Sequence, residues 1–190
     1  MLSFNMEYDL DRILSLVSFF STQTNFCGRT KLAKILFYCD WRHLKETGRT
    51  ITGLTYLTYK FGPLPQSLND ALKDKTSDLG KHISYNPESE GFKKPMIVRA
   101  SFNKKIFTPF ELQILDEAVF IFKDVKREDM IKASHWIDQP WTKTRNGRDV
   151  VIPIDEKMAF SDADAKITYE EYQDRKKDFE DVREMVCATR

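Results

Sequence analysis

The chain has 190 residues, of which 41% are hydrophobic and 13% are aromatic. This length favours a single domain, and that much apolar surface supports a core and excludes a chain that is disordered throughout. The 30 Lys and Arg residues nearly cancel the 29 Asp and Glu residues, so charge gives no reason to expect nucleic acid or an anionic membrane as the main partner.

Two helices are predicted in the first fifty residues. Apolar residues at three- and four-residue steps predict a helix over residues 10–20 with Asp9 as its N-cap. A second helix is expected from Thr30, as its cap, to Gly48. Its apolar surface is wider than one stripe, which is typical of a helix at the centre of a core: Leu32, Ile35, Leu36, Phe37, Tyr38, Cys39 and Trp41.

The middle of the chain is predicted to be partly extended. Residues 50–61 favour a short extended segment that Gly62-Pro63-Leu64-Pro65 stops. Pro65 suits the first turn of a short helix through Leu72. Residues 82–85 and 96–102 have the composition of two strands around a polar loop, which predicts a small β-hairpin.

The second half of the chain is predicted to be mainly helical. Thr108-Pro109-Phe110-Glu111 is a capping box with Pro at the first helical position, and its helix should run to about Val125. A shorter helix is expected over residues 128–136, and then a helical turn that begins at Pro140 and closes at Asn146-Gly147. Residues 150–152 are expected to be a short extended piece.

The C-terminal part is predicted to end in a charged amphipathic helix. A second capping box, residues 168–171, opens this helix, which carries Tyr172, Phe179, Val182 and Val186. Its acidic excess is compatible with a movable appendage, although packing on the domain is the favoured interpretation. We therefore expect a mainly α fold with a small β-hairpin (α+β): a compact helical domain over residues 6–146 and a C-terminal extension over residues 147–190.

The cysteines and the N-terminal segment predict the cellular compartment of the protein. Cys27, Cys39 and Cys187 match neither zinc pairs nor a redox motif, and free thiols suit a reducing compartment. The most apolar N-terminal run, residues 13–20, is too short to span a bilayer, and no basic segment precedes it as in a signal peptide. The expectation is a soluble, cytoplasmic protein with no membrane partner.

Few residues are candidates for chemistry. His135 could act as a general base, yet Cys27 and Cys39 lie in no local signature of a nucleophile, so a structural histidine packed by Trp136 and Trp141 is favoured. His43 and His82 are scattered, and the glycines never cluster, so we expect neither a metal nor a nucleotide cofactor.

Two surface features could serve a macromolecular partner. The second helix carries several basic residues that could contact nucleic acid, although a solvated helix flank is the favoured interpretation. These residues are Lys31, Lys34, Arg42, Lys45 and Arg49. The Phe61-Gly62-Pro63 turn follows several tyrosines, and aromatic anchors dominate interface energetics. The expected contact set for a protein partner lies around this turn and on the flank of the second helix: Tyr56, Tyr59, Phe61, Leu64 and Lys34.

Several separated pieces together resemble one known family. They are Lys31-Leu32-x-Lys34-Ile35-Leu36-x-Tyr38, Gly48 after a polar turn, Phe61-Gly62-Pro63-Leu64-Pro65, the helix start Thr108-Pro109-Phe110-Glu111, and Ser134-His135 followed by Pro140-Trp141. In this order and spacing they resemble the Panacea antitoxin domain, which includes SocA-like proteolytic adaptors, over about residues 6–145. Ala33 and Phe37 depart mildly from the family pattern.

The resemblance implies a non-enzymatic helical domain, found on phages and mobile elements, that neutralises a toxin by direct binding. In the SocA-like branch it implies an adaptor that delivers the toxin to an ATP-dependent protease. It also implies that one set of residues mainly defines the fold: Lys31, Leu32, Tyr38, Gly62, Pro63, His135, Pro140 and Trp141. The leading hypothesis is therefore an antitoxin; the alternatives are a proteolytic adaptor and, much less favoured, a His- or Cys-dependent hydrolase.

Overall fold

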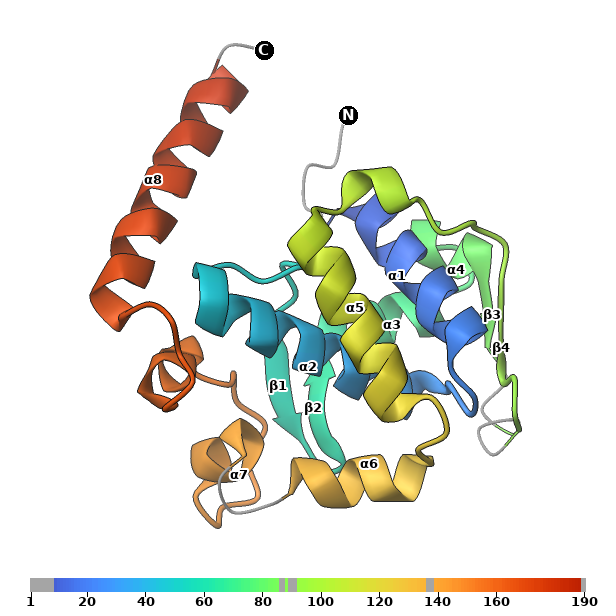
Figure 1. The fold of residues 1–190 in the computed structure, drawn as a ribbon. Coiled ribbons are helices and arrows are strands. Elements are labelled where there is room, and N and C mark those ends of the chain that lie inside the picture. Colours follow the sequence, from blue (N-terminus) through green and yellow to red (C-terminus); the bar gives the residue numbers. More distant parts are fainter. Residues whose placement is uncertain (1–8, 86–87, 89–91, 136–138, 189–190) are drawn as a thin grey trace.

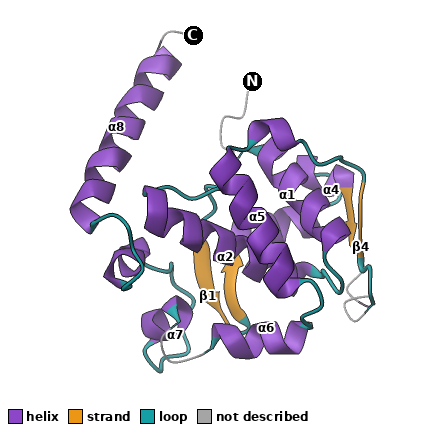
Figure 2. Cartoon of the chain, in the orientation of Figure 1, coloured by secondary structure: helices purple, strands orange, loops and turns teal. Residues whose placement is uncertain are grey.

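The computed structural model describes residues 9–85, 88, 92–135 and 139–188. The fold is mostly helical with two small antiparallel strand pairs (Figures 1 and 2), which confirms the predicted α+β class. Its helices are α1 (Leu10–Gln23), α2 (Arg29–Thr47), α3 (Gln66–Lys73), α4 (Asp78–His82), α5 (Pro109–Phe122), α6 (Arg127–Ser134), α7 (Pro140–Arg145) and α8 (Tyr169–Ala188), with short 3-10 turns η2 (Lys104–Ile106) and η3 (Glu156–Ser161). Its strands are β1 (Tyr56–Tyr59), β2 (Gly62–Pro65), β3 (Ile83–Tyr85) and β4 (Met96–Val98).

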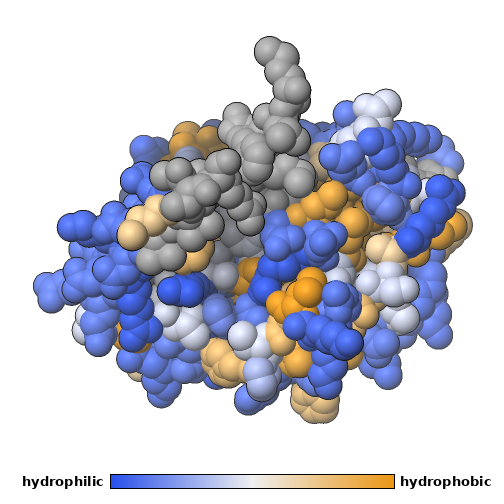
Figure 3. Space-filling view, turned by 90° about the horizontal axis from the view of Figure 1, so that it is seen from above, coloured by the Kyte–Doolittle hydropathy of each residue, from blue (hydrophilic) through white to orange (hydrophobic). Residues whose placement is uncertain are grey.

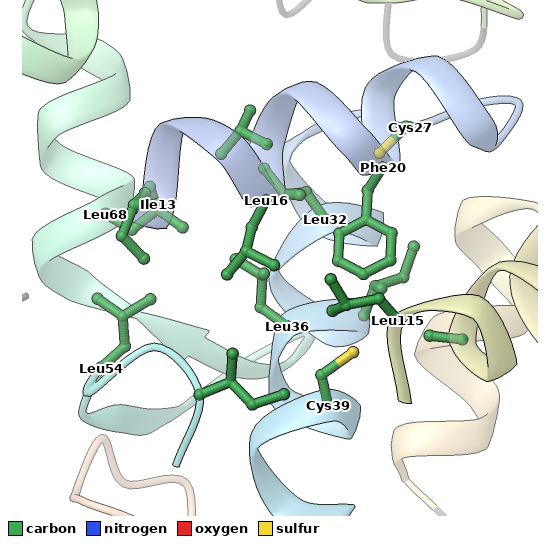
Figure 4. Close-up of a cluster of buried hydrophobic side chains, with 14 of the residues drawn as sticks. Ile13, Leu16, Phe20, Cys27, Leu32, Leu36, Cys39, Leu54, Leu68 and Leu115 are labelled. Atoms are coloured by element: carbon green, nitrogen blue, oxygen red, sulfur yellow. The ribbon is translucent and has the colours of Figure 1, made fainter. Parts of the chain in front are cut away.

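Helix α2 is the central element, as its wide apolar surface predicts. It contacts α1, α5, α6 and β2, and Figure 1 shows it in the middle of the molecule, between α5 and the β1–β2 hairpin. In the core, Leu32 and Leu36 of α2 meet Leu16 and Phe20 of α1 and Leu115 of α5 (Figure 4). All five side chains are completely buried, so the remaining elements are arranged around this helix.

Helix ends follow the predicted caps in most places. Asp9 caps α1, and Thr108 and Glu111 form the capping box of α5. At α8 the backbone N–H of Thr168 donates to Glu171 at 2.7 Å, and the N–H of Glu171 donates back to the Thr168 hydroxyl. The prediction for α2 was wrong by two residues, because Gly28 and not Thr30 is its N-cap. The predicted end of α6 at Trp136 lies outside the described residues.

The Gly62–Pro65 segment differs from its prediction, because it is a strand and not only a stop. It pairs antiparallel with β1, with Tyr59 opposite Gly62 and Tyr56 opposite Pro65. Proline is tolerated here because β2 is an edge strand, where a missing N–H breaks no ladder. The other edge of β1 is taken by residues 152–154: the Thr58 N–H donates to the Ile152 carbonyl, and the Ile154 N–H to the Tyr56 carbonyl, both at 2.9 Å.

The second hairpin is smaller than predicted and is preceded by a helix that the sequence did not reveal. Its strands are β3 and β4, and α4 occupies the residues just before β3. Helix α4 has five residues, too few for the periodicity that identifies a helix from sequence. Its N-cap is Ser77, whose hydroxyl accepts from the Gly80 N–H.

The C-terminal extension packs on the domain over its first part. Leu44 of α2 forms a small buried cluster with Ala159, Ile167 and Tyr172. Arg175 of α8 donates to the Thr47 carbonyl at 2.9 Å, and the Arg49 guanidinium lies 5.2 Å from the Phe179 ring centre. The far end of α8 projects away from the other elements (Figure 1), and 51% of Phe179 is exposed. The boundary between residues 146 and 147 stays a prediction, since residues 150–172 make these contacts with α2 and β1.

The surface offers little continuous apolar area on the face seen in Figure 3. That face is mainly hydrophilic, and its hydrophobic side chains form separate groups. None of the described helices is long and apolar enough to cross a membrane.

Gly62 provides a test of how closely the hairpin approaches α2. Its φ of +100° is strained for any other residue, and an added Cβ would lie 2.6 Å from Lys34 Nζ and also against Ser134 Oγ. We expect Gly62→Ala to lower the free energy of unfolding by about 3 kcal/mol. Gly147→Ala is the matched control, because Gly147 also has a positive φ but has open space around it; it should cost only about 1 kcal/mol. Equal losses in denaturant unfolding would contradict the close approach.

Candidate functional site

Helix α2 carries two lysines, one turn apart, that both point into the protein. Lys31 is completely buried, and only 6% of Lys34 is exposed. Burying an ammonium group costs free energy unless hydrogen bonds and charges compensate for it. The partners of each lysine therefore show whether its position is explained by the fold.

Lys31 is fully satisfied by backbone carbonyls. Its Nζ donates to the carbonyls of Asn25 and Val125 at 2.7 Å and of Lys123 at 3.3 Å, which accounts for all three ammonium hydrogens. Lys123 is the C-cap of α5, and carbonyls at a helix end lack helical partners and carry partial negative charge. Burial lowers the pKa of Lys31. This lysine joins α2 to the end of α5.

Lys34 is not satisfied in this way. Its Nζ donates to the carbonyl of Phe61, in the turn between β1 and β2. No described carboxylate forms an ion pair with it. Burial, helped by the nearby positive charge of Arg127, lowers the pKa of Lys34 to about 7. An ammonium with one neutral acceptor and no counter-ion is not explained by the fold alone.

Lys34 lines a cavity of about 340 Å³ between α2, β2, α6 and α7. The walls are mostly apolar and aromatic, and include Phe37 and Trp41 of α2 and Trp141 of α7. Ser134 of α6 also lines it, and the Ser134 hydroxyl donates to the Ile131 carbonyl at 2.8 Å. An apolar cavity with a few converging polar groups is the usual form of a ligand site.

Trp141 fixes one side of this region. Its Nε1 donates to the Tyr59 carbonyl at 2.8 Å, which holds α7 against β1. The ring of His135 stacks on it with centroids 3.9 Å apart and planes 9° apart. The guanidinium of Arg145 lies 4.8 Å from the same ring.

His135 has the surroundings of a packed ring. Burial and the positive charges of Lys34 and Arg145 lower its pKa, so the imidazole is neutral at pH 7. Its buried Nε2 has no hydrogen-bond partner in the described part of the chain, which leaves that nitrogen without a nucleophile to activate. Cys27 and Cys39 are both buried. The described residues also hold no group of three His, Cys, Asp or Glu side chains that could bind a metal ion.

Asp40, on another face of α2, is a buried acid that sequence reasoning missed. It accepts from the N–H groups of Ile51 and Thr52 at 2.7 and 2.8 Å, from the Thr52 hydroxyl, and from the Tyr56 hydroxyl at 2.7 Å. Burial raises the pKa of Asp40 to about 6, against the lowering effect of these hydrogen bonds. This carboxylate orders the segment between α2 and β1. No pattern around Asp40 distinguishes it from a solvated acid of an amphipathic helix.

The five residues expected to contact a partner are not equally accessible. Phe61 lies at the tip of the β1–β2 hairpin with 47% of it exposed, whereas Tyr59 and Leu64 are half-buried. Tyr56 and Lys34 are buried, so they offer no surface to a rigid partner. Contact with a partner stays a prediction for the set, and Phe61 is its best placed member.

Two cations flank Phe61. The Arg127 guanidinium lies 5.2 Å and the Lys60 ammonium lies 5.7 Å from the Phe61 ring centre.

The other residues that the resemblance marks as fold-defining lie mostly in the interior. Leu32, Gly62, Pro63 and Pro140 are buried, and the Tyr38 hydroxyl donates to Glu117 at 2.6 Å.

Comparison with known families gives a clear result. The family model described as "Antitoxin SocA-like, Panacea domain" matches residues 32–142, more than half of the chain. The chain belongs to the SocA-like Panacea family. The matched part of this Panacea protein runs from within α2 into α7 and includes the residues that line the Lys34 cavity except Asp162, but it does not include α8. Neither the curated proteins nor the solved structures include a match.

The two lysines of α2 should respond differently to the same substitution. Lys31→Met leaves three carbonyls without their donor and should lower the free energy of unfolding by about 3 kcal/mol. Lys34→Met removes one hydrogen bond but also the cost of an unpaired buried ammonium, so its effect at pH 7 should be below about 1 kcal/mol. Denaturant unfolding followed by circular dichroism measures both.

The pH dependence gives a second readout on the same variants. Because the folded-state pKa of Lys34 is lowered, the unfolded state binds more protons above pH 7, and wild-type stability gains with rising pH. Lys34→Met lacks this gain, so its stability relative to wild type should fall between pH 7 and about pH 10. A constant difference over this range would contradict the assignment.

Proposed function

We propose that this Panacea protein is an antitoxin that neutralises a cognate toxin by direct protein–protein contact, without catalysis. The observation that carries the proposal is the family match over residues 32–142. The surroundings of His135 agree with it, because they suit a packed ring better than a catalytic base. The toxin is expected to be encoded beside this protein, as the family resemblance implies.

The contact surface that we propose is centred on Phe61. An exposed aromatic ring flanked by Arg127 and Lys60 has the composition of an interface anchor, since aromatic and Arg side chains carry much of the binding free energy. The tip is also held rigidly, because the Tyr59 carbonyl accepts from Trp141 and the Phe61 carbonyl from Lys34. A preorganised anchor loses less entropy on binding. The matching toxin surface would be an apolar hollow with an acidic rim, within about 800 Å² per partner.

A second candidate function is a proteolytic adaptor that delivers the toxin to an ATP-dependent protease. The observation that favours it is α8, which projects from the domain (Figure 1) with Phe179 and Met185 exposed. Such a helix could contact a protease while Phe61 contacts the toxin. The two functions differ in the fate of the toxin: a simple antitoxin leaves its concentration unchanged, and an adaptor shortens its lifetime.

Co-expression with the protein encoded by the neighbouring gene tests the proposal. We expect the neighbour to stop growth alone and wild type to restore it, while Phe61→Ser weakens binding at least about tenfold, or about 1.4 kcal/mol. Phe120→Ser is the matched control, because Phe120 is an equally large and more exposed ring on α5; it should bind like wild type in calorimetry. The lifetime of the toxin in the same cells distinguishes the two functions, because only an adaptor shortens it.

The antitoxin proposal fails if the neighbour is harmless alone or remains lethal beside wild type. The proposed surface fails separately, if Phe61→Ser and Phe120→Ser protect and bind equally well.

A further inference from the structure

We propose that the cavity beside Lys34 is a binding site for a small aromatic carboxylate, with Lys34 as the group that binds the carboxylate. This inference does not depend on the antitoxin proposal. It starts from a buried cation that the fold leaves without an anion, and from the shape and lining of the space next to it.

The cavity has the size and walls of a small-molecule site. Its volume of about 340 Å³ lies within the usual range for such sites, roughly 300–1,000 Å³. Aromatic side chains from three helices line it: Phe37 and Trp41 from α2, Phe122 from α5, and Trp141 from α7. Aromatic rings pack favourably on other aromatic rings at modest entropic cost. The lining therefore favours a flat aromatic ligand.

The polar end of the cavity favours a negatively charged group. Lys34 Nζ makes one hydrogen bond, to the Phe61 carbonyl, so a protonated Nζ has two more hydrogens to donate. Lys34 itself lines the cavity, and glycine at position 62 lets the hairpin backbone pass close to Nζ, where a Cβ would lie 2.6 Å away. A carboxylate oxygen accepts such hydrogens in charge-assisted bonds, which are stronger than bonds between neutral groups.

The other charged groups around Lys34 are positive or already paired. Arg127 of α6 adds positive charge, and burial together with the positive charges of Lys34 and Arg145 lowers the pKa of His135. Among the cavity's other charged residues, Lys45 pairs with Asp162 and Asp164, and Arg42 pairs with Glu46. A cationic ligand would be repelled at the Lys34 end, and a neutral one would leave the ammonium unpaired.

Binding should be coupled to protonation of Lys34. With a pKa of about 7 the amine is mostly neutral at pH 8 and mostly charged at pH 6. A carboxylate stabilises the charged form, so its binding takes up a proton and its affinity falls by about tenfold from pH 6 to pH 8. Burial and the positive charges of Lys34 and Arg145 lower the pKa of His135, and any charge that its ring gains at low pH acts in the same direction as that of Lys34.

The test uses the full chain and a matched pair of probes, indole-3-acetate and its neutral amide, indole-3-acetamide. Calorimetry, with tryptophan fluorescence as a second signal, should show the acid binding at pH 6 and binding about tenfold more weakly at pH 8. The amide should bind at least about tenfold more weakly than the acid at pH 6, with no dependence on pH. Lys34→Met should bind both probes equally weakly, whereas Lys132→Met, which removes an exposed lysine of the same helix as Ser134, should behave like wild type.

Three results would overturn the proposal. One is the absence of binding of the acid at millimolar concentration, and another is equal binding of the acid and the amide by wild type. The third is unchanged acid binding by folded Lys34→Met. If that variant does not fold, the affinity of wild type for the acid at pH 6 and pH 8 decides. An affinity about tenfold weaker at pH 8 supports the proposal, and equal affinities overturn it.

Discussion

Burying α2 obliges the rest of the chain to provide partners for the charged side chains that this helix carries inward. Lys31 obtains three carbonyls, two of them from beyond the end of α5 or at its C-cap. Asp40 obtains four donor hydrogens from the segment that leads into β1. These bonds position α5 and β1 relative to the central helix. Hydrophobic packing holds the core together, and the charged groups of α2 determine the arrangement around it.

Lys34 differs from Lys31 and Asp40, because its charged group has one hydrogen-bond partner and no counter-ion among the described residues. Its ammonium touches the turn that presents Phe61 and also lines the neighbouring cavity. A strongly perturbed pKa at a cavity is a feature of functional sites more often than of a structural core. The hairpin tip, proposed to meet a toxin, and the cavity, proposed to hold a carboxylate, therefore share one side chain. A ligand that kept Lys34 charged would also favour its bond to the Phe61 carbonyl.

The sequence predicted features that depend on nearby residues. The central position of α2, the capping boxes of α5 and α8, and the extended piece that pairs with β1 were all predicted from local patterns. The difference between Lys31 and Lys34 was not, because two lysines three residues apart on one helix look alike in sequence. What separates them is a set of carbonyls, one of which belongs to Val125, 94 positions from Lys31. Strand β2 was missed because its two prolines are atypical of a strand and are tolerated only at a sheet edge. The hydrogen bonds of Asp40 were missed because they depend on how residues 51–56 fold back onto α2.

The pKa of Lys34 can be measured directly. Lysine side chains labelled with ¹³C at Cε can be titrated by NMR, and Lys34→Met identifies the resonance of Lys34 by its loss. We expect this resonance to titrate near pH 7, far below the exposed lysines at about pH 10.4. If Lys34 stayed protonated to pH 10, a counter-ion or water would have to compensate its charge. That result would contradict the claim that the charge of Lys34 is uncompensated, and it would remove the reason for proposing an anionic ligand beside it.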